Sequence, residues 1–264
     1  PEPVMKIAFL ALVPALLTAS CMAPTVDVTP RYGDFEVDGD FLAQPSGGGA
    51  TASASFDGMG LDGSDTTFSP RADLSWIGMH LSVTALNADF AGSGVVDNTI
   101  VLDGITLTGG TAVDSSFEFS TLSGALTWDL IPTDTVEVGI GIGVSLVDID
   151  FRIQETGGAM NEVTTDEVVP IPMLALRAAF DIGPIEVTGT ANAIDVGTDD
   201  GELAINDIDI NGSYDLFGGD DRMRGSAVLG WRSFEVEAEY EDGAEDVTGD
   251  WTIDGLYVGL QFSF

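Results

Sequence analysis

The sequence predicts an all-β protein, a closed up-and-down antiparallel transmembrane β-barrel of ten strands, with eight or twelve strands as the alternatives. Three observations support this fold. The last fourteen residues, Trp251–Phe264, alternate large apolar side chains with small or polar ones, as a strand with one face toward lipid does. Five segments end in an aromatic residue, and the first four lead into short connections. The strands that follow begin apolar, turn acidic and run into longer polar loops, which is typical of a barrel in a membrane.

Composition excludes several classes of protein. The chain has 264 residues, a net charge of −36 and 44% hydrophobic residues, and its mean hydropathy is +0.24. Disordered acidic chains are less apolar than this. Binding to nucleic acid requires a basic surface, and we therefore expect no nucleic-acid partner.

The start of the chain is typical of an export signal. Met5-Lys6 provides a charged beginning, and Ile7–Leu17 is an apolar run too short to span a membrane. We therefore assign residues 1–20 to a signal peptide, with residues 1–4 set aside as a remnant before the first Met. Residues 21–30 are expected to form a linker, and residues 31–264 the barrel.

Cys21, the only cysteine, ends the run Leu17-Thr18-Ala19-Ser20-Cys21. This run resembles the lipobox of bacterial lipoproteins, in which small residues precede a cysteine that becomes lipidated. It departs from that pattern at Thr18, where the family usually has Leu. Two outcomes remain open, lipidation of Cys21 or ordinary cleavage after a residue such as Ser20.

The expected strands alternate in direction along the chain. The rising strands are 32–42, 80–90, 135–153, 185–196 and 224–240. The descending strands end near five aromatic residues, Trp76, Trp128, Phe180, Tyr214 and Phe262, which we expect to form a girdle on the periplasmic side. Residues 44–67 are predicted to be a loop. Residues 99–108, within the loop 91–115, carry Asp103-Gly104 between short arms and predict a hairpin outside the membrane.

The C-terminal segment carries a family resemblance. Tyr257, Gly259, Phe262 and Phe264 resemble the assembly signal at the end of Gram-negative outer-membrane β-barrels. The resemblance covers about residues 31–264 and implies an outer-membrane location, contact with outer-membrane lipid and recognition by the barrel-assembly machinery. We expect a monomer. No motif identifies one characterised subfamily.

Strand parity predicts which side chains face the interior. The residues expected to line the lumen are Glu137, Glu186, Asp207, Asp209, Arg71, Arg177 and Arg232. The apolar set changes parity after Leu146 and near Ser233, which either a β-bulge or emergence from the membrane explains.

The sequence offers little support for catalysis. His80-Leu81-Ser82 resembles the His-x-Ser of outer-membrane lipid A deacylases, but no Glu follows at a suitable place, and no acid is evident for a charge relay. Ten strands also resemble the omptin proteases, which use a His–Asp pair at the outer rim. His80, the only histidine, falls at the opposite end. We therefore predict that the protein is not an enzyme.

Acidic residues cluster at the outer ends of two rising strands. Asp148, Asp150, Glu235, Glu237 and Glu239 are candidate ligands for diffusely bound divalent ions, and no EF-hand-like spacing is present. We expect no cofactor beyond loosely bound Ca²⁺ or Mg²⁺.

These observations predict a small passive pore. Its acidic lumen would prefer cations, because rings of acids in a narrow channel attract cations and repel anions. The alternative is a non-conducting structural or surface-exposed barrel, and a membrane-embedded hydrolase or a soluble β-sandwich lipoprotein is less favoured.

Lipidation at Cys21 is tested by mass spectrometry of the mature protein. We expect an N-terminus at Cys21 that carries a diacylglyceryl group. A free thiol at Cys21, or a mature chain that starts elsewhere, would contradict this expectation.

Overall fold

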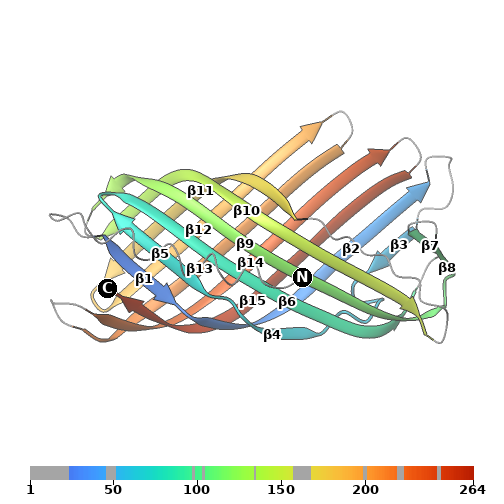
Figure 1. Ribbon diagram of the computed structural model, residues 1–264, viewed down its shortest axis with the longest axis horizontal. Helices are drawn as coiled ribbons and strands as arrows, with labels where there is room; N and C mark the ends of the chain where they lie inside the picture. Colours follow the sequence, from blue (N-terminus) through green and yellow to red (C-terminus); the bar gives the residue numbers. More distant parts are fainter. Residues whose placement is uncertain are drawn as a thin grey trace.

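The computed structural model is a barrel of long, tilted strands (Figure 1). It describes residues 24–45, 52–96, 99–102, 105–133, 135–156, 168–198, 201–218, 223–242 and 245–264. The predicted signal peptide and Cys21 lie outside these residues. Among the described residues, no helix is long and apolar enough to cross a membrane. The strands are β1 (Thr25–Thr29), β2 (Arg31–Pro45), β3 (Ala52–Ser55), β4 (Ser64–Phe68), β5 (Arg71–Trp76), β6 (Met79–Val95), β7 (Ile100–Leu102), β8 (Ile105–Leu107), β9 (Ala112–Pro132), β10 (Val136–Glu155), β11 (Val169–Ile182), β12 (Ile185–Thr198), β13 (Gly201–Phe217), β14 (Arg224–Asp242) and β15 (Glu245–Ser263).

The strands close into an antiparallel ring. β1 and β2 pair with the last strand, β15, β1 also pairs with β5, and the remaining wall strands pair with their neighbours in the chain. β2 continues β1 beyond Pro30, and β5 continues β4 beyond Ser69-Pro70, so each of these pairs forms one interrupted strand. The ring therefore has ten strands, and the predicted barrel is confirmed.

One boundary differs from the prediction. Thr25–Thr29, expected in a linker, forms β1 and pairs with Arg71–Ser75. Val26 and Val28 are exposed on the outer face, while Thr29 is buried inside. Pro30 has no N–H to donate to the ladder and interrupts the strand without ending it.

The short turns gather at the end of the barrel where the C-terminus lies, at the left of Figure 1. Ile77 and Gly78 both have positive φ, 50° and 70°, as a two-residue hairpin turn that follows the strand twist requires. We call this end the turn end and the opposite end the loop end. Four of the five aromatic residues expected in the girdle, at positions 76, 128, 180 and 214, are exposed here.

The loop end carries the predicted hairpin. β7 and β8 pair with each other in a separate two-stranded sheet outside the barrel wall. The predicted turn residues Asp103-Gly104 lie outside the described residues. The ring thus stays at ten strands, and the twelve-strand alternative is not needed.

The apparent changes of parity have one cause. The pairing of β9 with β10 runs without a shift from Gly139 to Glu155, and that of β14 with β15 is regular throughout. Gly139, Ser145, Val147 and Ile153 are all buried on the same inner face. The strands therefore contain no bulge at these places. Beyond these places the strands extend out of the membrane. Acidic side chains therefore occupy the outer face there, and apolar side chains fill the interior.

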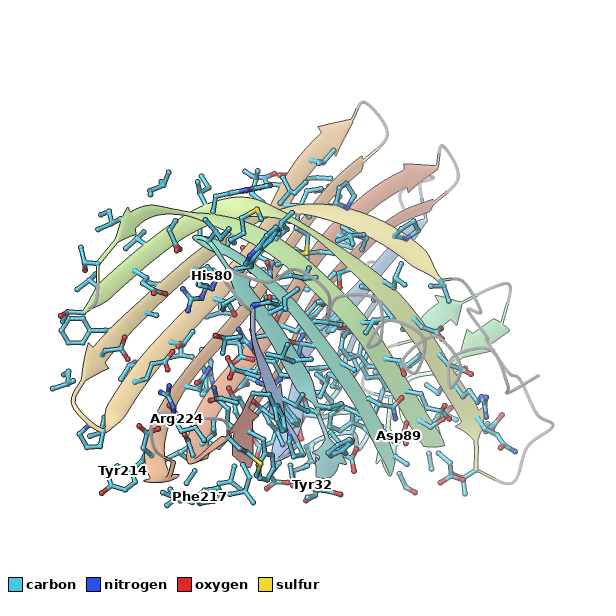
Figure 2. The ribbon with its side chains drawn as sticks, turned by 60° about the vertical axis from the view of Figure 1, so that its left-hand side comes forward. Tyr32, His80, Asp89, Tyr214, Phe217 and Arg224 are labelled. Carbon is cyan, nitrogen blue, oxygen red and sulfur yellow. The ribbon has the colours of Figure 1, made fainter. Side chains whose placement is uncertain are left out.

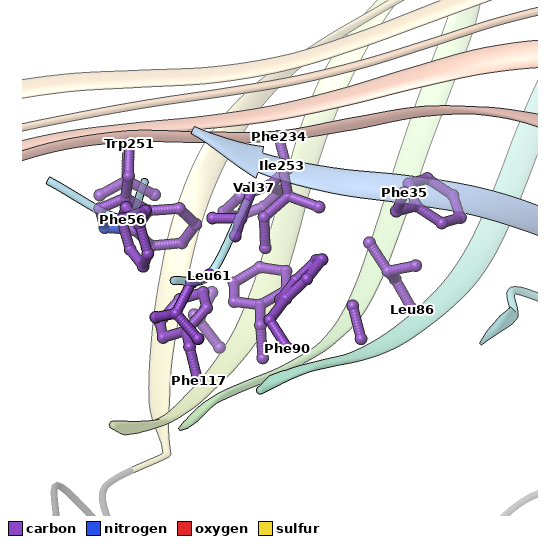
Figure 3. Close-up of a cluster of buried hydrophobic side chains, with 14 of the residues drawn as sticks. Phe35, Val37, Phe56, Leu61, Leu86, Phe90, Phe117, Phe234, Trp251 and Ile253 are labelled. Atoms are coloured by element: carbon purple, nitrogen blue, oxygen red, sulfur yellow. The ribbon is translucent and has the colours of Figure 1, made fainter. Parts of the chain in front are cut away.

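The loop-end half of the lumen is filled by a hydrophobic cluster (Figure 3). Phe117, Phe119, Phe234 and Trp251 are almost completely buried and come from three wall strands. Trp251 stands edge-on to Phe117 and Phe119, with ring centroids 5.6 and 5.2 Å apart. Edge-to-face contacts of this kind add to the stabilisation from area burial alone.

A segment between β3 and β4 folds into the lumen and completes this cluster. In this segment, Phe56–Leu61, the side chains of Phe56, Met59 and Leu61 are at most 1% exposed; we call it the plug segment. It packs against β6, where a Cβ at Gly92 would lie 1.7 Å from the Gly60 carbonyl oxygen. Glycine is required there because the two backbones touch.

Closure of the ring predicts resistance to detergent. Because every wall strand is paired on both sides, we expect the folded protein to stay compact in dodecyl sulfate until it is heated. Heated and unheated samples should therefore migrate differently on a gel. Identical migration would contradict a closed barrel.

Candidate functional site

Asp209, on β13, is the centre of a buried charge network in the middle of the barrel. Arg31 Nη1 donates a hydrogen bond of 2.6 Å to Asp209 Oδ2. Arg71 Nη1 lies 3.6 Å from the same oxygen, and the Tyr257 hydroxyl donates to Asp209 Oδ1. All four residues are less than 9% exposed. The network therefore joins β13 to β2 and β5, with which β13 shares no ladder hydrogen bonds.

Arg31 makes contacts with four different groups. Besides Asp209, its Nε donates to the Ser69 carbonyl oxygen at 2.7 Å, and its Nη2 lies 3.3 Å from Ser69 Oγ. The guanidinium carbon lies 4.4 Å from the centre of the Tyr257 ring. Arginine suits such a site because its planar group both forms several hydrogen bonds and stacks on an aromatic face.

Two further ion pairs flank Asp209. Arg232 donates to both oxygens of Asp207, at 2.9 and 3.0 Å. Arg71 Nε and Nη2 donate to Asp73 at 2.8 to 3.0 Å. Bidentate pairs fix the geometry of both partners, so these side chains are held rigidly.

A polar chamber of about 50 Å³ lies beside the network. Arg31, Arg71 and Tyr257 form one part of its lining, and Ser75 and His80 another. Figure 2 shows His80 among the side chains of the barrel interior. The acids in the lining are Asp27, Asp73 and Glu186. The chamber therefore has room for a few water molecules or a small ion.

His80 sits in a cluster of polar side chains from four neighbouring strands. Its Nδ1 lies 2.8 Å from Ser75 Oγ, and its Nε2 lies 3.0 Å from Asp129 Oδ2. Glu137 Oε2 is 3.8 Å from the same Nε2. The expectation that His80 has no acid partner is therefore wrong, because β9 and β10 bring two carboxylates to it.

The predicted lumen residues fall into two groups. Arg71, Asp207, Asp209 and Arg232 belong to the buried network. The other three lie nearer the turn end, where Arg177 Nη1 donates to Glu137 Oε2 at 2.7 Å and Glu186 accepts from Thr188 at 2.9 Å. A second, smaller cavity of about 10 Å³ is lined by Ser82, Thr84, Ser123, Thr190 and their neighbours.

The five predicted divalent ligands do not form one site. Asp148 and Asp150 lie on β10, whereas Glu235, Glu237 and Glu239 lie on β14, and three strands separate β10 from β14 in the ring. Asp150 pairs with Arg152 at 2.8 Å, and Glu235 accepts from Asn206 at 3.3 Å. The two groups belong to different parts of the barrel wall.

The residues of the predicted assembly signal divide between the two faces of β15. Phe264 is 60% exposed, on the side of Leu256, Val258 and Leu260, while Tyr257 is only 1% exposed inside. Gly259 and Phe262 pair with β14 at Val228 and Gly225. Tyr257 thus has a structural role in the network that the sequence resemblance did not imply.

Arg31, Ser75 and Asp129 were not identified from the sequence. Arg31 lies on the same face of its strand as Phe35 and Val37. Extending the predicted strand 32–42 by one residue would have placed Arg31 inside the barrel. Ser75 and Asp129 are brought to His80 only by strand register. His80 pairs with Ser75 on β5 and, on its other side, with Thr127 on β9, which lies next but one to Asp129.

Comparison with known proteins supports the fold. No family model and no curated protein matches the sequence. The structure is similar to the outer membrane protease OmpT from Escherichia coli, with a TM-score of 0.53, 9% identity and coverage of 94% of this chain and 99% of that one. A FadL homologue from Pseudomonas aeruginosa has a TM-score of 0.31 at 8% identity, covering 91% of this chain and 90% of that one. The Escherichia coli protein CdiB has a TM-score of 0.31 at 9% identity, covering 88% and 62%.

The chain therefore has the fold of Gram-negative outer-membrane β-barrel proteins, as the sequence predicted. The exposed apolar side chains of the wall, such as Ile142, Leu174 and Leu229, form the surface that faces lipid in this fold and indicate a membrane location.

The prediction that the protein is not an enzyme is contradicted by this comparison. The solved structure with a TM-score of 0.53 is a protease, so the fold gives no reason to exclude catalysis. The physical premise of that prediction also fails, because His80 has carboxylates within 4 Å.

The charge network is tested by removing its central acid. Asp209→Ala leaves the buried Arg31 and Arg71 without their shared partner, and we expect a loss of about 3–5 kcal/mol in the free energy of unfolding. Denaturant unfolding of the refolded protein, followed by tryptophan fluorescence, measures it. The control Asp89→Ala, on the exposed outer face, should change stability by less than about 0.5 kcal/mol. Equal losses in both variants would contradict a central role for Asp209.

Proposed function

We propose that the protein is an outer-membrane barrel that is closed at its loop end and offers a cation-attracting chamber at its turn end. The observation that carries this proposal is the hydrophobic cluster across the loop-end half of the lumen. Ions do not cross a constriction from which apolar side chains exclude water. This corresponds to the non-conducting alternative, with the predicted cation preference confined to the chamber.

The plug segment supports closure because it is held by backbone contacts. The Val95 amide donates to the Gly58 carbonyl at 3.0 Å, and the Phe56 amide donates to the Gly39 carbonyl at 3.1 Å. Rotation of side chains alone does not release such contacts. The resting barrel is therefore expected to pass no ions.

The chamber supports a preference for cations. Among the described residues, Asp27 and Glu186 make no ion pair with an arginine, although both line the chamber. Arg31, Arg71 and Arg177 are each engaged with an acid. Unneutralised acids in a narrow low-dielectric space attract cations.

The surroundings of the barrel follow from the same proposal. Its partners are outer-membrane lipid and the barrel-assembly machinery, and it works as a monomer. On the outer face, Asp89, Glu118 and Asp150 stand directly opposite one another on three consecutive strands. Like charges in this arrangement repel, and loosely bound Ca²⁺ or Mg²⁺ would relieve the repulsion.

Conductance in planar bilayers tests the closure. We expect no steady current from the refolded wild-type protein. The triple variant Phe56→Ser, Phe117→Ser and Phe119→Ser removes the aromatic seal, and we expect it to conduct with cation preference in a salt gradient. Phe68→Ser, which alters an exposed outer phenylalanine, should remain silent.

Two outcomes would count against the proposal. Steady wild-type conductance would show an open pore, and anion preference in the triple variant would contradict a cation-attracting chamber. Heat-dependent migration of each variant establishes that the barrel has folded.

A further inference from the structure

Four side chains at the turn end are brought together by strand register. Ser75 lies on β5, His80 on β6, Asp129 on β9 and Glu137 on β10, which are consecutive strands of the ring. Ser75 is close in sequence to His80, and Asp129 is close to Glu137, but the two pairs are far apart and only the register of the paired strands places them at one level. Their relation is therefore a property of the fold.

The distances suit a common ligand. One donor atom each from His80, Asp129 and Glu137 lies within 4.8 Å of the other two. His80 Nε2 is 3.0 Å from Asp129 Oδ2 and 3.8 Å from Glu137 Oε2. Tetrahedral zinc has bonds of about 2.0–2.2 Å to nitrogen and oxygen, which separates neighbouring donor atoms by about 3.3–3.5 Å. The observed spacings bracket this value.

Asp129 provides an independent indication of a ligand. Its side chain is only 5% exposed, and its Oδ1 is buried without a hydrogen-bond partner among the described residues. A buried carboxylate oxygen without a partner is costly. A metal ion bound by this carboxylate would compensate for that cost.

His80 and Glu137 are each held by a further hydrogen bond, as metal ligands in proteins usually are. Ser75 Oγ lies 2.8 Å from His80 Nδ1, the ring nitrogen that faces away from the carboxylates. Ligating histidines usually donate their second N–H to an oxygen, which fixes the ring and leaves the other nitrogen free to bind metal. Arg177 likewise holds Glu137 at 2.7 Å.

We propose that His80 Nε2, Asp129 and Glu137 bind one divalent transition-metal ion of the zinc type. One imidazole and two carboxylates are too few oxygens for calcium, while nitrogen ligation favours zinc over magnesium. Three protein ligands leave a fourth position, and His80 lines the chamber, so this position is accessible to water or a small anion. The site is independent of whether the barrel conducts.

Cobalt binding tests the site in the refolded full-length barrel. Four-coordinate Co²⁺ gives visible absorption, and we expect one equivalent to bind and to be displaced by Zn²⁺. His80→Gln and Asp129→Asn should each weaken binding by at least about 100-fold. Ser75→Ala, which removes only the supporting oxygen, should weaken it by about 10-fold. Glu237→Gln, on the exposed outer face, should leave it unchanged.

The controls distinguish a metal site from diffuse ion binding and from a nucleophilic site. If Glu237→Gln weakens binding as much as His80→Gln does, the metal binds diffusely to the acidic exterior and the proposal fails. If a fluorophosphonate labels Ser75 and the label is lost in His80→Gln, the cluster is a nucleophilic site and the metal assignment is overturned. Heat-dependent migration shows that each variant is folded, so that lost binding reports on the site itself.

Discussion

The shared pairing of Arg31 and Arg71 with Asp209 is the interaction on which the interior depends. Arginines that point into a narrow barrel lose most of their hydration, which is tolerable only when acids accept their hydrogen bonds. Asp209 lies on β13, while its partners come from β2, β5 and β15. The network therefore links β2 and β5 across the lumen to β13, with β15 contributing Tyr257 from between β2 and β14. It also divides the interior, with the polar chamber on its turn side.

The interior changes character along the barrel axis because its surroundings change. Where the wall contacts lipid, the outer face is apolar, and small or charged side chains fill the inside. Where the wall enters water, the outer face is acidic, and a hydrophobic core forms inside, as the buried Phe117 and Phe234 show. The loop-end half of the barrel thus has the apolar interior and polar exterior of a water-soluble protein, whereas the turn-end half has the reverse arrangement of a membrane protein.

Period-two alternation predicted the fold because it does not depend on distant contacts. Each wall strand shows two faces by itself, and the aromatic and turn residues mark its end. β1 was missed because Pro30 interrupts the alternation of Val26 and Val28. The plug segment was missed because its isolated Phe56, Met59 and Leu61 stand in a loop composition, and only the barrel around them gives them a core.

The candidate site was less predictable than the fold. Parity correctly pointed Arg71, Asp207, Asp209 and Arg232 inward, but pairing between them depends on closure of the ring. The partners of His80 are 49 and 57 positions away, at Asp129 and Glu137, and reach it through the stagger of three strands. The spacing of these residues in the sequence therefore does not predict that they lie together.

The contact between Gly92 and Gly60 has a mechanical consequence. A plug held only by side-chain contacts would move whenever those side chains change rotamer. Here the main chain of the plug rests on the main chain of the wall, and β3 joins it to β2 by a ladder of its own. In the wild-type barrel, opening the loop end would require separating the β2–β3 ladder as a unit, which is a local unfolding event.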